Sequence, residues 1–156
     1  MSTVVAVNFQ TTLLVRDTCL CLHVQRAARV LARRFDEALK PVGLTNGQFS
    51  LIMSLNRPDM PGVPRATIGS VAELLGMDRT TVTASARVLF ERGLITVNAE
   101  PEDRRTKVLR LTEEGRQVLA DAVPIWMRVH GEIERELGGT KPELLRRDLQ
   151  VLSQGG

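Results

Sequence analysis

Hydroxyl and guanidinium side chains cluster in one short polar segment, and such groups can bind DNA base edges and phosphates. The segment starts at Asp78, and the apolar residues Val82, Ala86 and Leu89 follow at helical spacing. Burial of that side turns the opposite face to solvent, because successive helical residues are about 100° apart. Polar side chains expected on or beside the outer face are Arg79, Thr80, Thr81, Thr83 and Arg87. The pattern predicts a helix that fits the DNA major groove, and a solvated helix of a small bundle is the alternative.

A second cationic group follows between two apolar segments. Residues 94–98 and 106–111 are rich in β-branched and aliphatic side chains and flank a polar, turn-forming stretch, which predicts a β-hairpin. The charged residues at or beside its tip are Asp103, Arg104, Arg105 and Lys107. An arginine on such a tip suits the narrow, electronegative minor groove, whereas a soluble turn is the simpler interpretation. Because the hairpin directly follows the polar helix, the two features together favour DNA binding.

The elements that position these residues have clear local signals. Thr67 can cap a short helix before the polar one, and Gly76 suits the left-handed turn between the two helices. Short helix, glycine turn and polar helix form a helix-turn-helix pattern. An earlier helix begins at the capping-box sequence of residues 45–48, and the three prolines of residues 56–64 predict a loop. We therefore expect residues 45–112 to form a winged helix-turn-helix lobe that binds DNA.

Long amphipathic helices are expected on both sides of this lobe, which makes the fold mainly α. Residues 17–44 predict the first helix of a helical dimerisation region, beginning near Thr18, and residues 113–156 predict its C-terminal helices. Pro124 predicts a kink or local break within the C-terminal segment. Residues 1–16 are mildly apolar and interrupted by polar residues, and we expect a flexible arm there rather than a cleaved signal peptide.

Composition narrows the range of functions. The chain has 156 residues, enough for a hydrophobic core, and no run approaches the roughly 20 apolar residues of a membrane-spanning helix. Aromatic residues make up only 3%, which argues against a base-stacking platform for single-stranded nucleic acid. Cys19 and Cys21 are too few for a disulfide framework and suggest a reducing cytoplasm. We find no phosphate-binding glycine loop, metalloprotease motif or nucleophile–base pair, so neither an enzyme nor a cofactor is expected.

Three stretches of the sequence resemble the MarR family of winged helix-turn-helix transcription factors. They are GLTNGQF at residues 43–49, LLGMDRTTVTASARVLFERGLI at residues 74–95, and PEDRRTKVLRLTEEG at residues 101–115. The resemblance extends over about residues 19–152. It implies a transcriptional regulator that binds double-stranded DNA at an inverted-repeat operator.

The resemblance also implies roles for individual residues. The family's D-x-R wing signature falls on Asp103 and Arg105, which implies that Arg105 enters the minor groove and that Asp103 orients it. It further implies an obligate homodimer joined by the first helix and the last two helices. Periodicity supports this dimer, because Trp126, Ile133 and Leu137 need a partner surface that a thin winged domain does not supply.

For a small-molecule effector, the resemblance implies an anionic or phenolic aromatic compound bound between the dimer helices and the DNA-binding lobe. The candidate residues that bind this compound are His23, Arg26 and Arg29, which can form ion pairs with a carboxylate. The alternative is that they are solvated charges on the helix surface.

Cys21 supports a different form of regulation. Its position matches the reactive cysteine of the family's branch that senses organic hydroperoxides, although the tyrosines that hydrogen-bond the sulfur in that branch have no counterpart here, because the chain has no tyrosine. A buried, inert cysteine is the alternative. No metal site is expected, since Cys19 and His23 share a helix face and Cys21 points away. Three classes remain: a ligand-released repressor, a redox-sensing repressor, and a winged-helix module that binds protein.

Overall fold

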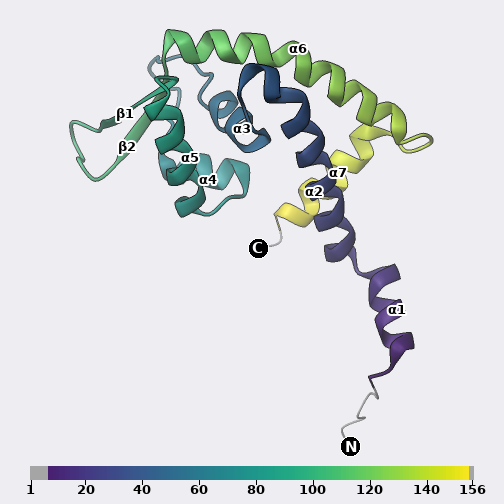
Figure 1. The fold of residues 1–156 in the computed structure, drawn as a ribbon. Helices are drawn as coiled ribbons and strands as arrows, with labels where there is room; N and C mark the ends of the chain where they lie inside the picture. The colour runs from purple at the N-terminus through teal and green to yellow at the C-terminus, as the bar shows by residue number, and fades with distance from the viewer. Residues whose placement is uncertain (1–6, 155–156) are drawn as a thin grey trace, which may run out of the picture.

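A computed structural model describes residues 7–154. The elements, labelled in Figure 1, are α1 (Phe9–Thr18), α2 (Leu20–Leu39), a 3-10 turn (Lys40–Val42), α3 (Asn46–Ser54), α4 (Ile68–Leu75), α5 (Arg79–Glu91), β1 (Ile95–Ala99), β2 (Lys107–Leu111), α6 (Glu113–Glu136) and α7 (Pro142–Ser153). This confirms the mainly helical fold with an antiparallel hairpin that the sequence predicts. Within the described residues, no helix is both long and apolar enough to span a membrane.

The helix-turn-helix forms because short-range caps start and end its helices. Thr67 and Ser70 form a capping box at the start of α4, and Gly76 ends α4 in the left-handed region at φ 62°. Asp78 caps α5 directly after this turn. A capping box between Thr45 and Gln48 likewise starts α3, as the sequence predicts. These caps orient α3, α4 and α5 so that each packs against the other two.

The wing is an antiparallel pair in which Ile95 lies opposite Leu111 and Ala99 opposite Lys107. The segment before α4 joins the same sheet at the outer edge of β2, where the Leu109 N–H donates to the Ala66 carbonyl at 2.8 Å. An ion pair between Arg65 and Glu100, at 2.5 Å, links this segment to the far end of β1. The wing is therefore attached to the helix-turn-helix by both backbone and side-chain contacts.

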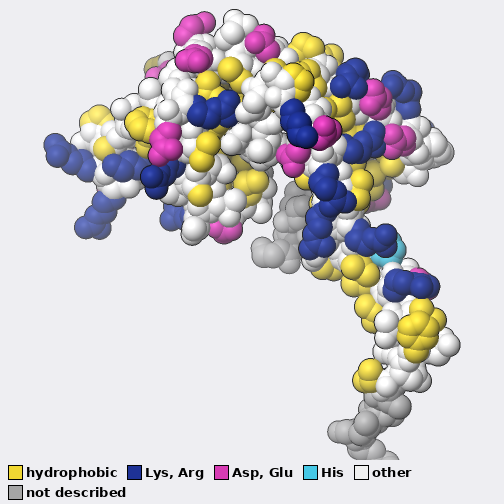
Figure 2. Space-filling model, viewed as in Figure 1, with side chains coloured by type: hydrophobic (Ala, Val, Ile, Leu, Met, Phe, Trp, Pro, Cys, Tyr) yellow, Lys and Arg dark blue, Asp and Glu magenta, His cyan; other side chains and the backbone are white. Residues whose placement is uncertain are grey.

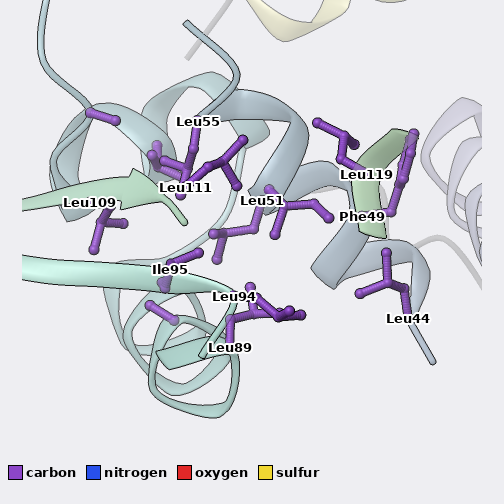
Figure 3. Packing of buried hydrophobic residues seen from close by; sticks show 14 of the residues in the cluster. Leu44, Phe49, Leu51, Leu55, Leu89, Leu94, Ile95, Leu109, Leu111 and Leu119 are labelled. Carbon is purple, nitrogen blue, oxygen red and sulfur yellow. The ribbon is translucent and has the colours of Figure 1, made fainter. Parts of the chain in front are cut away.

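One hydrophobic core lies between the wing and the helices of the lobe. Its fully buried side chains include Ile52, Val71, Val82, Leu89 and Ile95, each at most 1% exposed. Figure 3 shows core leucines from α3, α5, α6 and the hairpin directed into the same interior. Because α3, α4, α5 and the wing share this core, the two expected DNA-binding features are held in a fixed relative position.

The long α6 covers the lobe and packs against α2. Its first turn passes close to the hairpin at Gly115, where an added Cβ would lie 2.0 Å from the Leu94 carbonyl oxygen, so only glycine fits. Of the kink or local break that the sequence predicts at Pro124, the break does not occur: α6 continues through this residue, and Figure 1 shows it as one arched helix. Proline has no N–H, so the carbonyl four residues before it has no donor within the helix. Pro124 is exposed, so this carbonyl can bind water. The buried side chains of Ala122 and Val129 pack the helix against the core before and after Pro124.

The prediction of an arm over residues 1–16 also needs correction. Phe9–Thr18 form the helix α1, while residues 1–6 lie outside the described part of the chain. The physical reason is a cap: Asn8 is one of the polar residues of this segment, and its side chain accepts a hydrogen bond from the Thr11 N–H at 3.1 Å. Cys19 then separates α1 from α2 in an extended conformation and caps α2, which starts at Leu20 rather than near Thr18.

Candidate nucleic-acid interface

The outer face of α5 is small, polar and exposed. Val82, Ala86 and Leu89 are at most 3% exposed on the inner side, as their spacing predicts. The outer face has a shallow concave surface lined by Arg79, Thr80, Thr83, Ala84, Arg87, Val88 and Glu91. Small side chains at its centre leave room for close approach of another molecule, and hydroxyls and guanidiniums can donate hydrogen bonds to it.

The start of α5 is anchored by Asp78. Its carboxylate accepts hydrogen bonds from the Thr81 N–H at 2.8 Å and from the Thr81 hydroxyl at 2.7 Å. Both hydrogen bonds hold the pKa of Asp78 below its ordinary value of 3.8, and the bond from the Thr81 hydroxyl has the larger effect. The Thr81 hydroxyl is therefore committed to the cap. Thr83 likewise donates its hydroxyl hydrogen to the Arg79 carbonyl at 2.8 Å, so its hydroxyl oxygen retains both lone pairs as acceptors.

Arg79 lies where α5, α4 and the wing meet. Its guanidinium rests against Gly69 in the first turn of α4, so closely that a Cβ at residue 69 would lie 2.4 Å from Nη2. These three elements line one groove, which we call the wing groove, with the residues Thr67, Ile68, Gly69, Arg79, Thr83, Arg105, Thr106 and Lys107. The structure thus brings predicted residues from the helix and from the hairpin into a single cationic concavity.

The wing tip is shaped by Asp103. Its carboxylate accepts hydrogen bonds from the Arg105 N–H at 3.0 Å and from the Thr106 hydroxyl at 2.8 Å. Asp103 therefore orients Arg105 through the backbone and leaves the guanidinium to solvent. Figure 2 shows Lys and Arg side chains gathered around the hairpin. Among residues 7–154, no carboxylate lies within ion-pair distance of Arg79, Arg104, Arg105 or Lys107, so this positive charge is available to a polyanion.

Arg87 differs from the other cations of the interface. Its Nε donates to Glu91 Oε1 at 2.8 Å along α5. Both side chains are more than half exposed, and such surface pairs contribute little to stability. A phosphate or a base edge can therefore replace Glu91 as the partner of Arg87.

The proposed effector ligands lie elsewhere. His23, Arg26 and Arg29 are exposed on the first half of α2, and none of them lines the wing groove. His23 Nδ1 lies 2.8 Å from the Cys19 carbonyl oxygen, and Arg29 donates to Gln25. The structure does not bring these three side chains together around a cavity.

Sequence reasoning missed an apolar groove between α3, α4 and α6. Its lining residues are Phe49, Ser50, Met53, Ser54, Leu74, Leu75 and Trp126. The ring centroids of Phe49 and Trp126 lie 6.5 Å apart in a stacked arrangement, and His130 also stacks on Trp126, with a centroid distance of 4.6 Å. Leu74 is 63% exposed at the edge of this groove. The sequence signal was the pair Phe49 and Met53, four residues apart on one helix face, but only packing places Trp126 against them.

Comparisons with solved structures place this geometry among known proteins. The chain is 37% identical to the transcriptional regulator MosR of Mycobacterium tuberculosis, solved in complex with DNA, with a TM-score of 0.76 over 87% of this chain and 94% of that one. A MarR-family regulator from Rhodococcus sp. RHA1 has the same fold, with 23% identity and a TM-score of 0.72 over 89% of this chain and 99% of that one. The chain belongs to the MarR family. It is thus a DNA-binding transcriptional regulator.

A sequence relative agrees with membership of the MarR family. The regulator BilQ of Clostridioides difficile is 26% identical over 117 residues, which are 75% of this chain and 76% of BilQ. No family model matches the chain. The relatives are transcriptional regulators rather than enzymes. The MarR-family fold accounts for the position of the wing beside α5, because both pack on one core.

Proposed function

We propose that this MarR-family protein binds an inverted-repeat operator as a homodimer and represses transcription until a small ligand releases it. The observation that carries the proposal is the wing groove, where Arg79 and Thr83 of the helix-turn-helix face Arg105 and Lys107 of the wing. A helix in the major groove and a hairpin tip in the adjacent minor groove require this juxtaposition.

Each residue of the interface has a role in this proposal. Thr80, Thr83 and Arg87 of α5 contact base edges in the major groove, and Arg105 enters the minor groove. Arg79 and Lys107 bind phosphates from the two sides of the wing groove, while Arg104 adds a phosphate contact at the tip. Thr81 and Asp103 act indirectly, because their side-chain oxygens already hold the start of α5 and the wing turn.

The dimer follows from helices that lack a core of their own. Within the described part of the chain, neither α1 nor α7 has a buried residue. At 12 residues, α7 is near the length below which isolated helices are marginal in water, yet it carries the apolar side chains Leu145, Leu149 and Leu152. A second copy of the chain would cover them. We accordingly assign residues 17–44 and 113–156 to dimerisation and residues 45–112 to DNA binding.

The apolar groove is our candidate for the effector site, in place of His23, Arg26 and Arg29. An aromatic compound can lie against the stacked Phe49 and Trp126 while it touches α4 of the helix-turn-helix. Support comes from BpsR of Bordetella bronchiseptica, whose DNA binding is regulated by 6-hydroxynicotinic acid. BpsR shares the fold, with 22% identity and a TM-score of 0.74 over 89% of this chain and 96% of that one.

The experiment that tests this function begins with selection of duplexes from a random DNA library. We expect an inverted repeat, bound with an affinity that falls steeply as salt rises, because phosphate contacts release counterions. A screen of aromatic acids by fluorescence anisotropy should then find a compound that releases the duplex. Enrichment of no sequence, or binding insensitive to salt, would favour the protein-binding alternative.

A redox-sensing repressor remains the second candidate, because Cys21 is exposed rather than buried. Its Sγ accepts one hydrogen bond, from Gln25 at 3.1 Å, where tyrosine hydroxyls are expected to donate to a sensing thiol. We predict that Cys21→Ser retains full operator binding and that an organic hydroperoxide does not release the wild type. If peroxide releases the wild type, reductant restores it and the Cys21→Ser variant stays bound, the redox sensor becomes the function.

A further inference from the structure

The C-terminal end of α5 is bonded to the end of the dimerisation helix α2 through Arg92. Arg92 caps α5, and its Nη1 donates a hydrogen bond to the Gly43 carbonyl at 2.7 Å. Gly43 ends the 3-10 turn that follows α2. Among the side-chain hydrogen bonds of residues 7–154, this is the one that joins α5 or its caps to α2 and its turn. The contact therefore connects the helix that faces DNA with a helix of the dimerisation region.

The guanidinium of Arg92 lies directly against the backbone of Gly43. Gly43 has φ 66°, a left-handed conformation that glycine adopts without strain. A Cβ added to Gly43 would lie 3.1 Å from Arg92 Nη2, so a side chain at residue 43 would press on the guanidinium. Both terminal nitrogens of Arg92 are thus close to the same glycine. Such a contact has a defined geometry, which a lysine ammonium reproduces only in part.

Arg92 has no other partner that explains its position. It is exposed, and no carboxylate of residues 7–154 lies within ion-pair distance of its guanidinium. It lines neither the wing groove nor the concave outer surface of α5. At 1.5 Å per residue, Arg92 lies roughly 20 Å along α5 from Asp78, where the candidate DNA contacts begin. Arg92 is therefore placed to orient α5 rather than to touch DNA.

A second polar contact attaches α2 to the lobe at a different point. Asp36 of α2 accepts a hydrogen bond at 2.7 Å from the backbone N–H of Asn46, the first residue of α3. Leu39 and Leu44, which lie between these contacts in sequence, are buried in the shared core. The lobe is thus held to the end of α2 at α3 and, through Arg92, at α5. Two separate attachment points oppose rotation of the lobe about either one.

We propose that Arg92 is a positioning residue for DNA binding: its bond to Gly43 fixes the angle between the lobe and α2, and thereby the distance between the two copies of α5 in the dimer. Half-sites one DNA turn apart, roughly 34 Å, demand a fixed distance. One inserted base pair moves a half-site by about 3.4 Å and rotates it by about 34°, so only a loosely attached lobe can follow it. This role rests on the proposed homodimer, and the first experiment distinguishes failure of the dimer from failure of Arg92.

Electron–electron double resonance on the full chain measures the distance between the two lobes without DNA. A nitroxide at Glu73→Cys, on an exposed position of α4, gives one label per copy when Cys19 and Cys21 are replaced by serine. We expect a narrow distance distribution in this labelled parent. Arg92→Met should broaden it about twofold, because the hydrogen bond is lost while the side-chain stem remains. Arg92→Lys keeps a donor and should restore roughly half of the difference.

Operator spacing gives a second measurement, by fluorescence anisotropy. Wild type should prefer the selected inverted repeat over the same repeat with one inserted base pair by at least about tenfold, and Arg92→Met should reduce this preference to about threefold. Its affinity for a duplex with a single half-site should stay unchanged, because the surface of α5 is intact. A phosphate contact by Arg92 would instead weaken binding to all duplexes and lower the slope of log affinity against log salt by about one.

Arg116→Met is the matched control, because Arg116 is an exposed arginine whose ion-pair partner Glu113 belongs to the same helix. It should change neither the distance distribution nor the spacing preference. A labelled parent without dipolar coupling would overturn the proposed dimer and the role of Arg92 together. Equal widths in the parent and in Arg92→Met, or an unchanged spacing preference, would overturn the role of Arg92 alone. The salt result expected of a phosphate contact would also overturn it. Should Arg92→Met not fold, Arg92→Lys decides by the same two measurements.

Discussion

At the scale of single residues, the candidate interface contains cations in two different states. Arg79, Arg104, Arg105 and Lys107 lie beyond ion-pair distance of every carboxylate in residues 7–154, whereas Arg87 has Glu91 as a partner. DNA binding by Arg87 must therefore replace an existing pair, and this lowers its net contribution. Arg105 has no such cost, because Asp103 accepts a hydrogen bond from its backbone rather than from its guanidinium.

Arg105→Ala is expected to weaken operator binding by about tenfold to a hundredfold, or roughly 1–3 kcal/mol, because the minor-groove contact is lost. The Tm should stay unchanged, since the side chain is exposed. Fluorescence anisotropy measures the affinity, and Arg128→Ala on α6 is the matched control. Wild-type affinity in the Arg105→Ala variant would refute the minor-groove role.

Gly69→Ala should have opposite effects on stability and on binding. Alanine stabilises a helix interior by about 1 kcal/mol relative to glycine, and the gain is smaller at residue 69 because it lies in the first turn of α4. The added Cβ takes the space of the Arg79 guanidinium. We expect a small rise in Tm together with about threefold weaker operator binding. A double-mutant cycle with Arg79→Ala provides the check, because Gly69→Ala should have no effect on affinity once Arg79 is absent. Equal effects in both backgrounds would show that Gly69 does not act through Arg79.

At the scale of elements, each helix of the lobe starts at a cap that the sequence displays, and the caps determine where the functional side chains emerge. Asp78 is the cap with the most direct influence, because α5 begins one residue after it. Its hydrogen bonds to Thr81 place Thr80 and Thr83 on the outward face.

The Asp78 cap should give stability a component that depends on pH. The folded-state pKa is below the ordinary value of 3.8, so the carboxylate stabilises the folded chain fully above that value, and the contribution is lost as the pH falls through the folded-state pKa. Asp78→Asn retains a capping oxygen and does not titrate. The Tm of the wild type minus that of Asp78→Asn should shrink between about pH 5 and about pH 3, as measured by circular dichroism. A constant difference over that range would rule out a charged cap.

At the scale of the whole molecule, the described chain has two regions of different character. The lobe from α3 to β2 has a dense core, whereas α1, the first half of α2 and α7 expose apolar side chains. In the proposed dimer these helices cover one another, and the two copies of α5 lie about 34 Å apart, one turn of DNA. Operator binding then depends on residues that never touch DNA.

Replacing Leu145 and Leu149 of α7 with arginine should dissociate the dimer, because charges would enter its apolar interface. Sedimentation velocity at micromolar concentration should show the wild type at twice the chain mass of 17.3 kDa and the double variant at the single mass. Operator affinity should fall in the double variant, because its dimer dissociates. Arg147→Gln on the same helix is the control and should remain dimeric. A monomeric wild type would overturn the proposed assembly.

Local signals in the sequence determined most of the lobe. The capping boxes at Thr45 and Thr67, the left-handed Gly76 and the apolar spacing from Val82 to Leu89 each act over a few residues, so the sequence alone predicted α3, α4, α5 and the hairpin. Such interactions form within one turn of helix and need no distant partner. The same reasoning failed at Asn8 and Pro124, because a polar residue can start a helix and packing can keep one continuous through proline.

Tertiary structure decided which distant residues meet. Arg79 and Lys107 line the same wing groove because α4, α5 and β2 pack on one core, and no local rule relates residues so far apart in sequence. The apolar groove needs Trp126 of α6 beside Phe49 of α3. The sequence determined which side chains are available and which helix face carries them. Their convergence into sites was decided by close packing of the elements, because packing alone determines the distances between them.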